Sequence, residues 1–104
     1  MQYYEPPLAY NVGEPYVKEG EIEESGTPVT LDVNATLGGN AHSGSVVNLS
    51  TKWDLYVELS QDGVVFADQA TLLPQKAVDL DKEDVHSIRI DAQRNHVKYQ
   101  VVAH

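Results

Sequence analysis

Apolar and polar residues alternate along much of this chain, which is the period of a β-strand with one face in a core and one face outside it. The clearest stretch is residues 53–66, WDLYVELSQDGVVF, in which every second residue from Trp53 to Leu59 is apolar. Asp62-Gly63 then predicts a tight turn, because glycine accepts the positive φ that hairpin turns require. Residues 64–66 are expected to return as the next strand.

Turn-forming residues divide the rest of the chain into similar short segments. Strands are predicted at residues 29–37, 46–50, 53–60, 64–66, 70–73, 77–80, 86–91 and 97–101. About seven or eight short strands without a helix-period run indicate an all-β fold, an antiparallel β-sandwich or jelly roll. The predicted core comprises Val33, Leu37, Val47, Leu49, Trp53, Leu55, Val57, Leu59, Phe66, Leu72, Leu80, Ile88, Ile90, Tyr99 and Val101.

Residues 1–28 differ in composition from residues 29–104, so the chain divides into an extended N-terminal arm and one β-sandwich domain. The arm holds four of the five prolines and four of the six tyrosines, and its six glutamates and one lysine give it a charge of −5. Proline disfavours helix, and only a short strand at residues 16–22 is expected. A disordered acidic tail is the alternative. Aromatic anchors favour docking on a partner, and the predicted partner-binding residues are Tyr3, Tyr4, Leu8, Tyr10 and Tyr16.

Charge and composition exclude several classes of function. The net charge is −9 and the seven Lys and Arg residues are scattered, which argues against binding a nucleic-acid backbone. The chain has no cysteine, so disulfides and thiolate metal sites are ruled out. No signal sequence and no apolar run of about 20 residues is present, which predicts synthesis in a cytoplasm and no membrane span.

Candidate chemistry is sparse. The four histidines, His42, His86, His96 and His104, match no metal or catalytic spacing. The sequence leaves open one alternative, a metal or anion site formed by three copies of one histidine at a trimer axis. The acidic residues near positions 19–24 and 79–84 lack the interleaved Asp, Asn and Gly of a calcium loop and are expected to form solvated faces. The sequence therefore predicts no catalytic, cofactor-binding or metal-binding residue, and favours binding or assembly over an enzyme.

Four segments together carry a resemblance to a known class of protein. They are LYVELSQDGVVF at residues 55–66, TLLP at 71–74, VDL at 78–80 and IRI at 88–90. This pattern, over about residues 45–103, resembles the small β-sandwich accessory proteins of tailed bacteriophage virions, which include decoration (cement) proteins and other head or tail subunits.

The resemblance implies a non-catalytic structural protein, made in the host cytoplasm and located in the virion. Such a subunit decorates or stabilises the capsid, or a head/tail joint, and needs no cofactor. Its expected partners are the major capsid protein or other virion subunits, and a homo-oligomer is expected, with a trimer favoured. Asp62 and Gly63 are the turn that defines the fold in this pattern.

A carbohydrate-binding β-sandwich module is the alternative function. It requires exposed aromatic rings, for which the sandwich offers Trp53, Tyr56 and Tyr99. Trp53 is in phase with Leu55 and Val57, so its ring is expected in the core rather than on a sugar-binding platform.

Overall fold

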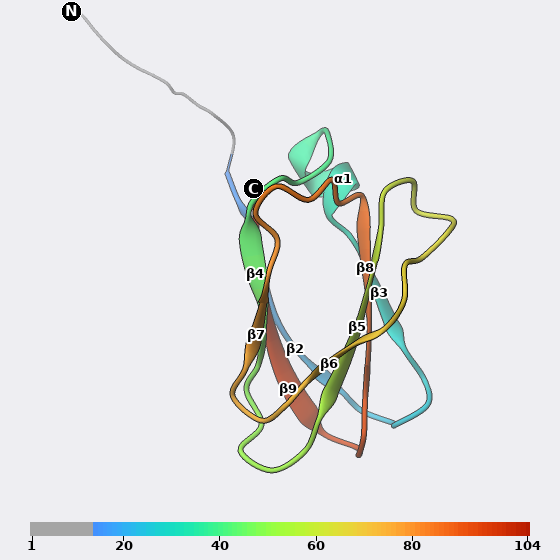
Figure 1. The fold of residues 1–104 in the computed structure, drawn as a ribbon, viewed down its shortest axis with the longest axis vertical. Coiled ribbons are helices and arrows are strands. Elements are labelled where there is room, and N and C mark those ends of the chain that lie inside the picture. Colours follow the sequence, from blue (N-terminus) through green and yellow to red (C-terminus); the bar gives the residue numbers. More distant parts are fainter. Residues whose placement is uncertain (1–13) are drawn as a thin grey trace, which may run out of the picture.

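Two four-stranded antiparallel sheets form the protein in the computed structural model, which describes residues 14–104 (Figure 1). One sheet contains, in spatial order, β2 (Tyr16–Ile22), β9 (Val97–Ala103), β4 (Gly44–Asn48) and β7 (Ala77–Asp79). The other contains β3 (Val29–Asp32), β8 (Ser87–Ala92), β5 (Leu55–Ser60) and β6 (Ala70–Leu72). A single short helix, α1 (Val33–Leu37), follows β3 in the described residues. The all-β sandwich predicted from the apolar pattern is confirmed.

The core lies between the two sheets and consists mainly of branched aliphatic side chains. The predicted core residues that are buried are Val33, Leu55, Val57, Leu72, Leu80, Ile88, Ile90, Tyr99 and Val101. Leu37, Trp53 and Leu59 are half-buried and pack against this core. Ile22, which lies in β2, is also fully buried. The period-two pattern of β5, β8 and β9 therefore identified the inward face of each of these central strands.

In β4, the predicted inward face is wrong. Val46 and Asn48 are buried, whereas Val47 is half-buried and Leu49 is exposed. Asn48 replaces an apolar residue in the core because its amide is fully hydrogen-bonded. Its Nδ2 donates to the carbonyls of Trp53, Leu72 and Leu73 at 2.9, 2.9 and 3.2 Å, and its Oδ1 accepts from the Ser50 N–H at 2.9 Å.

The strand predicted over residues 29–37 is also partly wrong, because it ends at Asp32 and gives way to α1. The Asp32 carboxylate accepts a hydrogen bond from the Ala35 N–H at 3.0 Å and caps the helix. Gly38, with φ of 75°, ends it in the left-handed conformation. Val33 is buried all the same, since the first helical residue points into the core.

The turn at Asp62-Gly63 exists, but the return strand expected at residues 64–66 does not. Gly63 has the predicted positive φ, 81°. Val64 and Val65 then leave the sheet, with 79% and 70% of their surface exposed. Phe66, expected in the core, is half-buried and keeps only an isolated bridge with Ser60, so β5 finds its partner strand further on, at β6. Residues 61–69 are therefore a loop that projects from the sandwich (Figure 1).

The short strand expected at residues 16–22 is confirmed as β2, which pairs with β9 from Tyr16 opposite Ala103 to Ile22 opposite Val97. From Tyr16 onwards, the segment interpreted as an arm thus belongs to the sheet. Tyr16 itself is half-buried and packs against the core. The other four residues predicted to bind a partner, Tyr3, Tyr4, Leu8 and Tyr10, lie outside the described residues.

Candidate functional site

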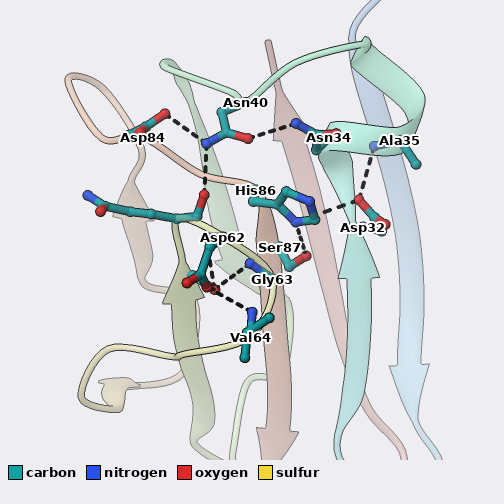
Figure 2. A network of polar contacts seen from close by, with 12 residues as sticks. Asp32, Asn34, Ala35, Asn40, Asp62, Gly63, Val64, Asp84, His86 and Ser87 are labelled. Atoms are coloured by element: carbon teal, nitrogen blue, oxygen red, sulfur yellow. Dashed lines mark hydrogen bonds and ion pairs between the residues drawn. The ribbon is translucent and has the colours of Figure 1, made fainter.

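Polar side chains gather at the end of the sandwich where α1, the loop after β5 and the segment before β8 meet (Figure 2). His86 lies near the centre, with its Nδ1 2.7 Å from the Ser87 Oγ and 3.9 Å from the Asp32 Oδ1. A Ser-His-Asp relay needs its serine and its carboxylate at opposite ring nitrogens. Here both approach the same nitrogen, so these three residues lack the geometry of a nucleophile and its base.

The His86 ring has a structural role against the turn. A Cβ added to Gly63 would lie 2.7 Å from the ring Cε1, so only glycine allows the loop to pass this close. Asp32, which also lies near the His86 Nδ1, is already engaged as the cap of α1. The positive φ of Gly63 and the close approach of His86 therefore hold the start of the loop in one place.

Asn40 connects three segments in the same network. Its Nδ2 donates to the Gln61 carbonyl at 3.0 Å and to the Asp84 carboxylate at 2.9 Å, while its Oδ1 accepts from the Asn34 amide at 2.8 Å (Figure 2). These contacts join the helix, the loop after β5 and the segment that leads to β8. The network orders the loops at this end of the sandwich.

Asp62 organises the loop from within. Its Oδ1 accepts hydrogen bonds from the Val64 and Val65 N–H groups at 2.8 and 2.9 Å and from the Ser60 hydroxyl at 3.1 Å. The backbone hydrogen bonds from Val65 and Val64 lower the pKa of the Asp62 carboxyl, because they stabilise its charged form. An ionised Asp62 thus fixes the backbone that displays the two valines.

The far part of the loop is held by Phe66. The guanidinium of Arg89 lies 4.1 Å from the centroid of the Phe66 ring, a cation–π contact. The same guanidinium is oriented by Glu58, whose Oε1 accepts from the Arg89 Nε at 2.7 Å. The loop is therefore held at Asp62, near its start, and at Phe66, further along.

Below this loop lies a groove of about 370 Å³. Its apolar lining comes from both sheets and the loop and includes Val57, Leu59, Val65, Phe66, Ala70, Val78 and Val85. Carboxylates also line it, at Asp62, Asp68, Glu83 and Asp84, and within the described chain no Lys or Arg does. A groove with an apolar floor and an acidic border can bury an apolar side chain and attract a positive charge beside it.

The other candidate His, Asp and Glu side chains do not gather at one place in residues 14–104. No group of three His, Asp or Glu side chains in residues 14–104 is placed to hold a metal ion. His42 and His96 contact separate partners, the Glu83 carbonyl at 2.9 Å and the Glu21 carboxylate at 2.8 Å. In the same part of the chain, no helix has the length and apolar character needed to cross a membrane.

Of the three aromatic residues considered for a sugar platform, Tyr99 is buried and Trp53 is half-buried. Tyr99 is only 2% exposed, and its ring lies against Gly20 of the neighbouring strand. Trp53 is half-buried, and the Arg94 and Lys52 cations lie 4.8 and 5.3 Å from its ring centroid. Tyr99 is therefore unavailable to a surface ligand, and Trp53 offers a ring already in contact with two cations.

Comparisons of the chain with protein-family models, curated proteins and solved structures find no match. The assignment of a site thus depends on the geometry alone. Sequence reasoning missed the groove and the exposure of Val64 and Val65, because two adjacent valines after Asp-Gly are typical of a returning strand. The feature of the sequence that indicated a loop is the presence of two aspartates, Asp62 and Asp68, within residues 61–69.

Proposed function

We propose that this chain is a non-catalytic structural protein of a bacteriophage virion that decorates or stabilises the capsid or a head/tail joint. It contacts the major capsid protein or other virion subunits through its N-terminal segment and through the sandwich surface formed by residues 61–69 and the adjacent groove. A homo-oligomer, with a trimer favoured, is part of the proposal. The protein is made in the host cytoplasm and is then incorporated into the particle.

The observation that carries the binding role is the display of Val64 and Val65. Two adjacent β-branched side chains with 79% and 70% exposure contribute nothing to the core. Contiguous exposed apolar surface marks interaction sites, and Val65 continues into the apolar lining of the groove. Asp62 orders their backbone before any partner arrives. Binding then costs less conformational entropy than it would for a loop that orders only on contact.

The virion setting is supported by the sequence resemblance over about residues 45–103 and by the tyrosines that precede β2. A two-sheet sandwich with a projecting apolar loop is compatible with that setting. Such a small domain has limited surface, so the tyrosine-rich sequence that precedes β2 would add contact area at low entropic cost.

The proposal is tested on phage particles purified from the culture that carries this gene. Mass spectrometry and immunogold labelling should find the protein on intact particles, and its absence there would exclude the virion role. Recombinant protein should then rebind particles that lack it. Deletion of residues 2–13, which leaves β2 intact, and the double substitution Val64→Ser with Val65→Ser should each weaken rebinding.

The matched control is Val17→Ser. Val17 is also exposed, at 59%, but it lies in β2, at the opposite edge of its sheet from β7, which lines the groove. Its substitution should leave rebinding unchanged. Equal loss in this control and in the loop variant would mean that general surface apolarity, rather than the Val64-Val65 loop, drives association.

A further inference from the structure

The groove opens at the side of the sandwich where both sheets end in their shortest strands. β6 and β7 have three residues each, and each is the outermost strand of its sheet (Figure 1). Within residues 14–104, each pairs on one side only, β6 with β5 and β7 with β4. The outer backbone groups of such an edge can pair with an added extended segment.

The floor of the groove requires an apolar group from its occupant. Val57, Ala70 and Val78 come from three strands of the two sheets and line the groove together with Val65 and Phe66 of the loop. Burying an aliphatic side chain there would remove its surface and theirs from water, which is the main favourable term in association. An occupant without an apolar side chain would leave this floor uncovered.

The acidic border of the groove requires a positively charged group from its occupant. Asp62, Asp68, Glu83 and Asp84 are all exposed carboxylates. Backbone hydrogen bonds lower the pKa of the Asp62 carboxyl and so favour its charged form, and Asp84 is oriented by the Asn40 amide at 2.9 Å. Arg89, which contacts the loop, is already paired with Glu58 and stacked on Phe66. The acidic border is therefore not neutralised from within the groove.

These features point to one occupant. We propose that the groove binds an extended peptide segment of a partner subunit in which aliphatic residues are flanked by Lys or Arg. The aliphatic side chains enter the floor, the basic side chains meet the carboxylates, and the peptide backbone pairs with the edge of β6 or β7. This inference depends on the proposed structural role and names the chemistry of the partner at the same surface.

The chain's own N-terminal segment fits this chemistry poorly. Residues 1–13 contain Glu5 and no Lys or Arg, so they cannot supply cationic side chains to the border. A second copy of the chain offers only scattered Lys and Arg on a net charge of −9. The charge pattern therefore favours a different subunit as the source of the peptide.

The test uses short synthetic peptides, blocked at both ends, and isotope-labelled full-length protein. The probe alternates Lys and Val; one comparison peptide alternates Glu and Val, and the other alternates Lys and Ser. We expect the Lys/Val peptide to shift backbone amide resonances in residues 57–70, 77–79 and 83–85. The two comparison peptides should bind at least about tenfold more weakly, because each lacks one of the two required contacts.

Charge-reversal variants separate groove binding from general attraction to an acidic protein. The double variant Asp68→Lys with Glu83→Lys should weaken Lys/Val peptide binding about tenfold or more. The control, Glu23→Lys with Glu24→Lys, changes net charge equally but lies in the exposed segment after β2. It should change affinity less than about twofold, since exposed charges beyond a Debye length are largely screened.

Three results would overturn the inference. One is equal weakening by both double variants, and another is equal binding of the Glu/Val peptide. The third is a shift of the groove resonances on deletion of residues 2–13 without any peptide, which would assign the groove to the protein's own N-terminal segment. Because these measurements use no particles, failure here with retained particle binding would overturn only the peptide inference, whereas absence from particles would overturn the proposed function.

Discussion

The two open sides of the sandwich differ in how they are built. On one side, β2 forms seven residue pairs with β9 and contributes the fully buried Ile22 to the core. On the other side, β6 and β7 form three pairs each with their inner neighbours. The first side carries the exposed charged residues Lys18 and Glu19 along an extended edge, while the second borders the groove, which Val65 of the loop also lines.

From this difference we expect one side of the sandwich to contribute mainly to stability and the other mainly to binding. A long edge strand with exposed Lys18 and Glu19 resists pairing with another chain, because charges on an edge discourage strand addition. The edges of β6 and β7 carry one charged residue, Asp79, and are limited mainly by their length of three residues each, so strand addition there depends on side-chain contacts in the adjacent groove. We therefore expect substitutions on the β2 side to act on folding, and substitutions at the loop to act on binding.

Asn48 is the largest expected exception, because it is buried in β4 and links the side of the sandwich that holds the groove to the core. Asn48→Asp would replace a donor amide by a carboxylate that faces the carbonyls of Trp53, Leu72 and Leu73. We expect a loss of about 3–5 kcal/mol in the free energy of unfolding, the usual cost of an uncompensated buried charge. Urea denaturation measures it.

The control for Asn48 is the same substitution at Asn95. Asn95 is exposed, and its Oδ1 accepts a hydrogen bond from the Ser25 N–H at 2.8 Å. Asn95→Asp keeps that acceptor, so its effect should stay within about 0.5 kcal/mol. Similar effects at the two positions would show that the Asn48 amide does not anchor β6 to β4.

On the β2 side, Ile22→Ala should destabilise the fold by about 2–5 kcal/mol, because removing a fully buried side chain leaves a cavity. Ile22 has no exposed surface, whereas Val17 in the same strand is exposed. Val17→Ala should therefore change stability by less than about 0.5 kcal/mol, as is usual for surface substitutions. Thermal or urea unfolding of both variants provides the measurement. A small effect at Ile22 would mean that β2 is not part of the cooperative core.

How much the sequence predicted also differs between the two regions. Strands β5, β8 and β9 were predictable because each alternates apolar and polar residues with one face buried. In β4 the alternation predicted the wrong inward face, because the buried residue Asn48 is polar. Its hydrogen-bond partners are carbonyls on other segments, which no local pattern reveals. The capping of α1 by Asp32 overrode the alternation of residues 33–37 in the same way.

The loop could not be predicted because strand propensity obscured its local turn and because its other contacts are non-local. Val64 and Val65 have high strand propensity, but propensity is outweighed by the hydrogen bonds that Asp62 accepts from their N–H groups. The packing of His86 on Gly63 and of Arg89 on Phe66 joins residues distant in sequence. The groove depends on these contacts and is therefore a property of the folded chain.

A smaller effect is expected from Asp62→Asn, and it should depend on pH. The folded-state pKa of Asp62 is lowered by backbone hydrogen bonds from Val65 and Val64. Its ionised form therefore stabilises the fold above the unfolded-state pKa, and this contribution is lost as the pH falls through the lower folded-state pKa. The stability difference between wild type and variant should be greatest near neutral pH and vanish in strong acid.

Urea midpoints measured across this range provide the test, with the carboxyl titration of Asp62 followed by NMR. Asp68→Asn is the matched control, because Asp68 is an exposed carboxylate in the same loop, whereas the hydrogen bonds from Val64 and Val65 go to Asp62. A pH-independent effect of Asp62→Asn, or an equal effect at Asp68, would contradict the role given to the charged turn.

The smallest effect on stability is expected at the most exposed residues, Val64 and Val65. Neither side chain is buried. Substituting both by Ser should therefore change the free energy of unfolding by less than about 0.5 kcal/mol. The same variant should lose particle rebinding and bind the Lys/Val peptide more weakly, since Val65 lines the groove. Urea unfolding and the two binding assays, run on one preparation, separate these outcomes. A loss above about 1 kcal/mol without any change in binding would reverse the comparison, because it would make the loop a part of the core rather than a surface for a partner.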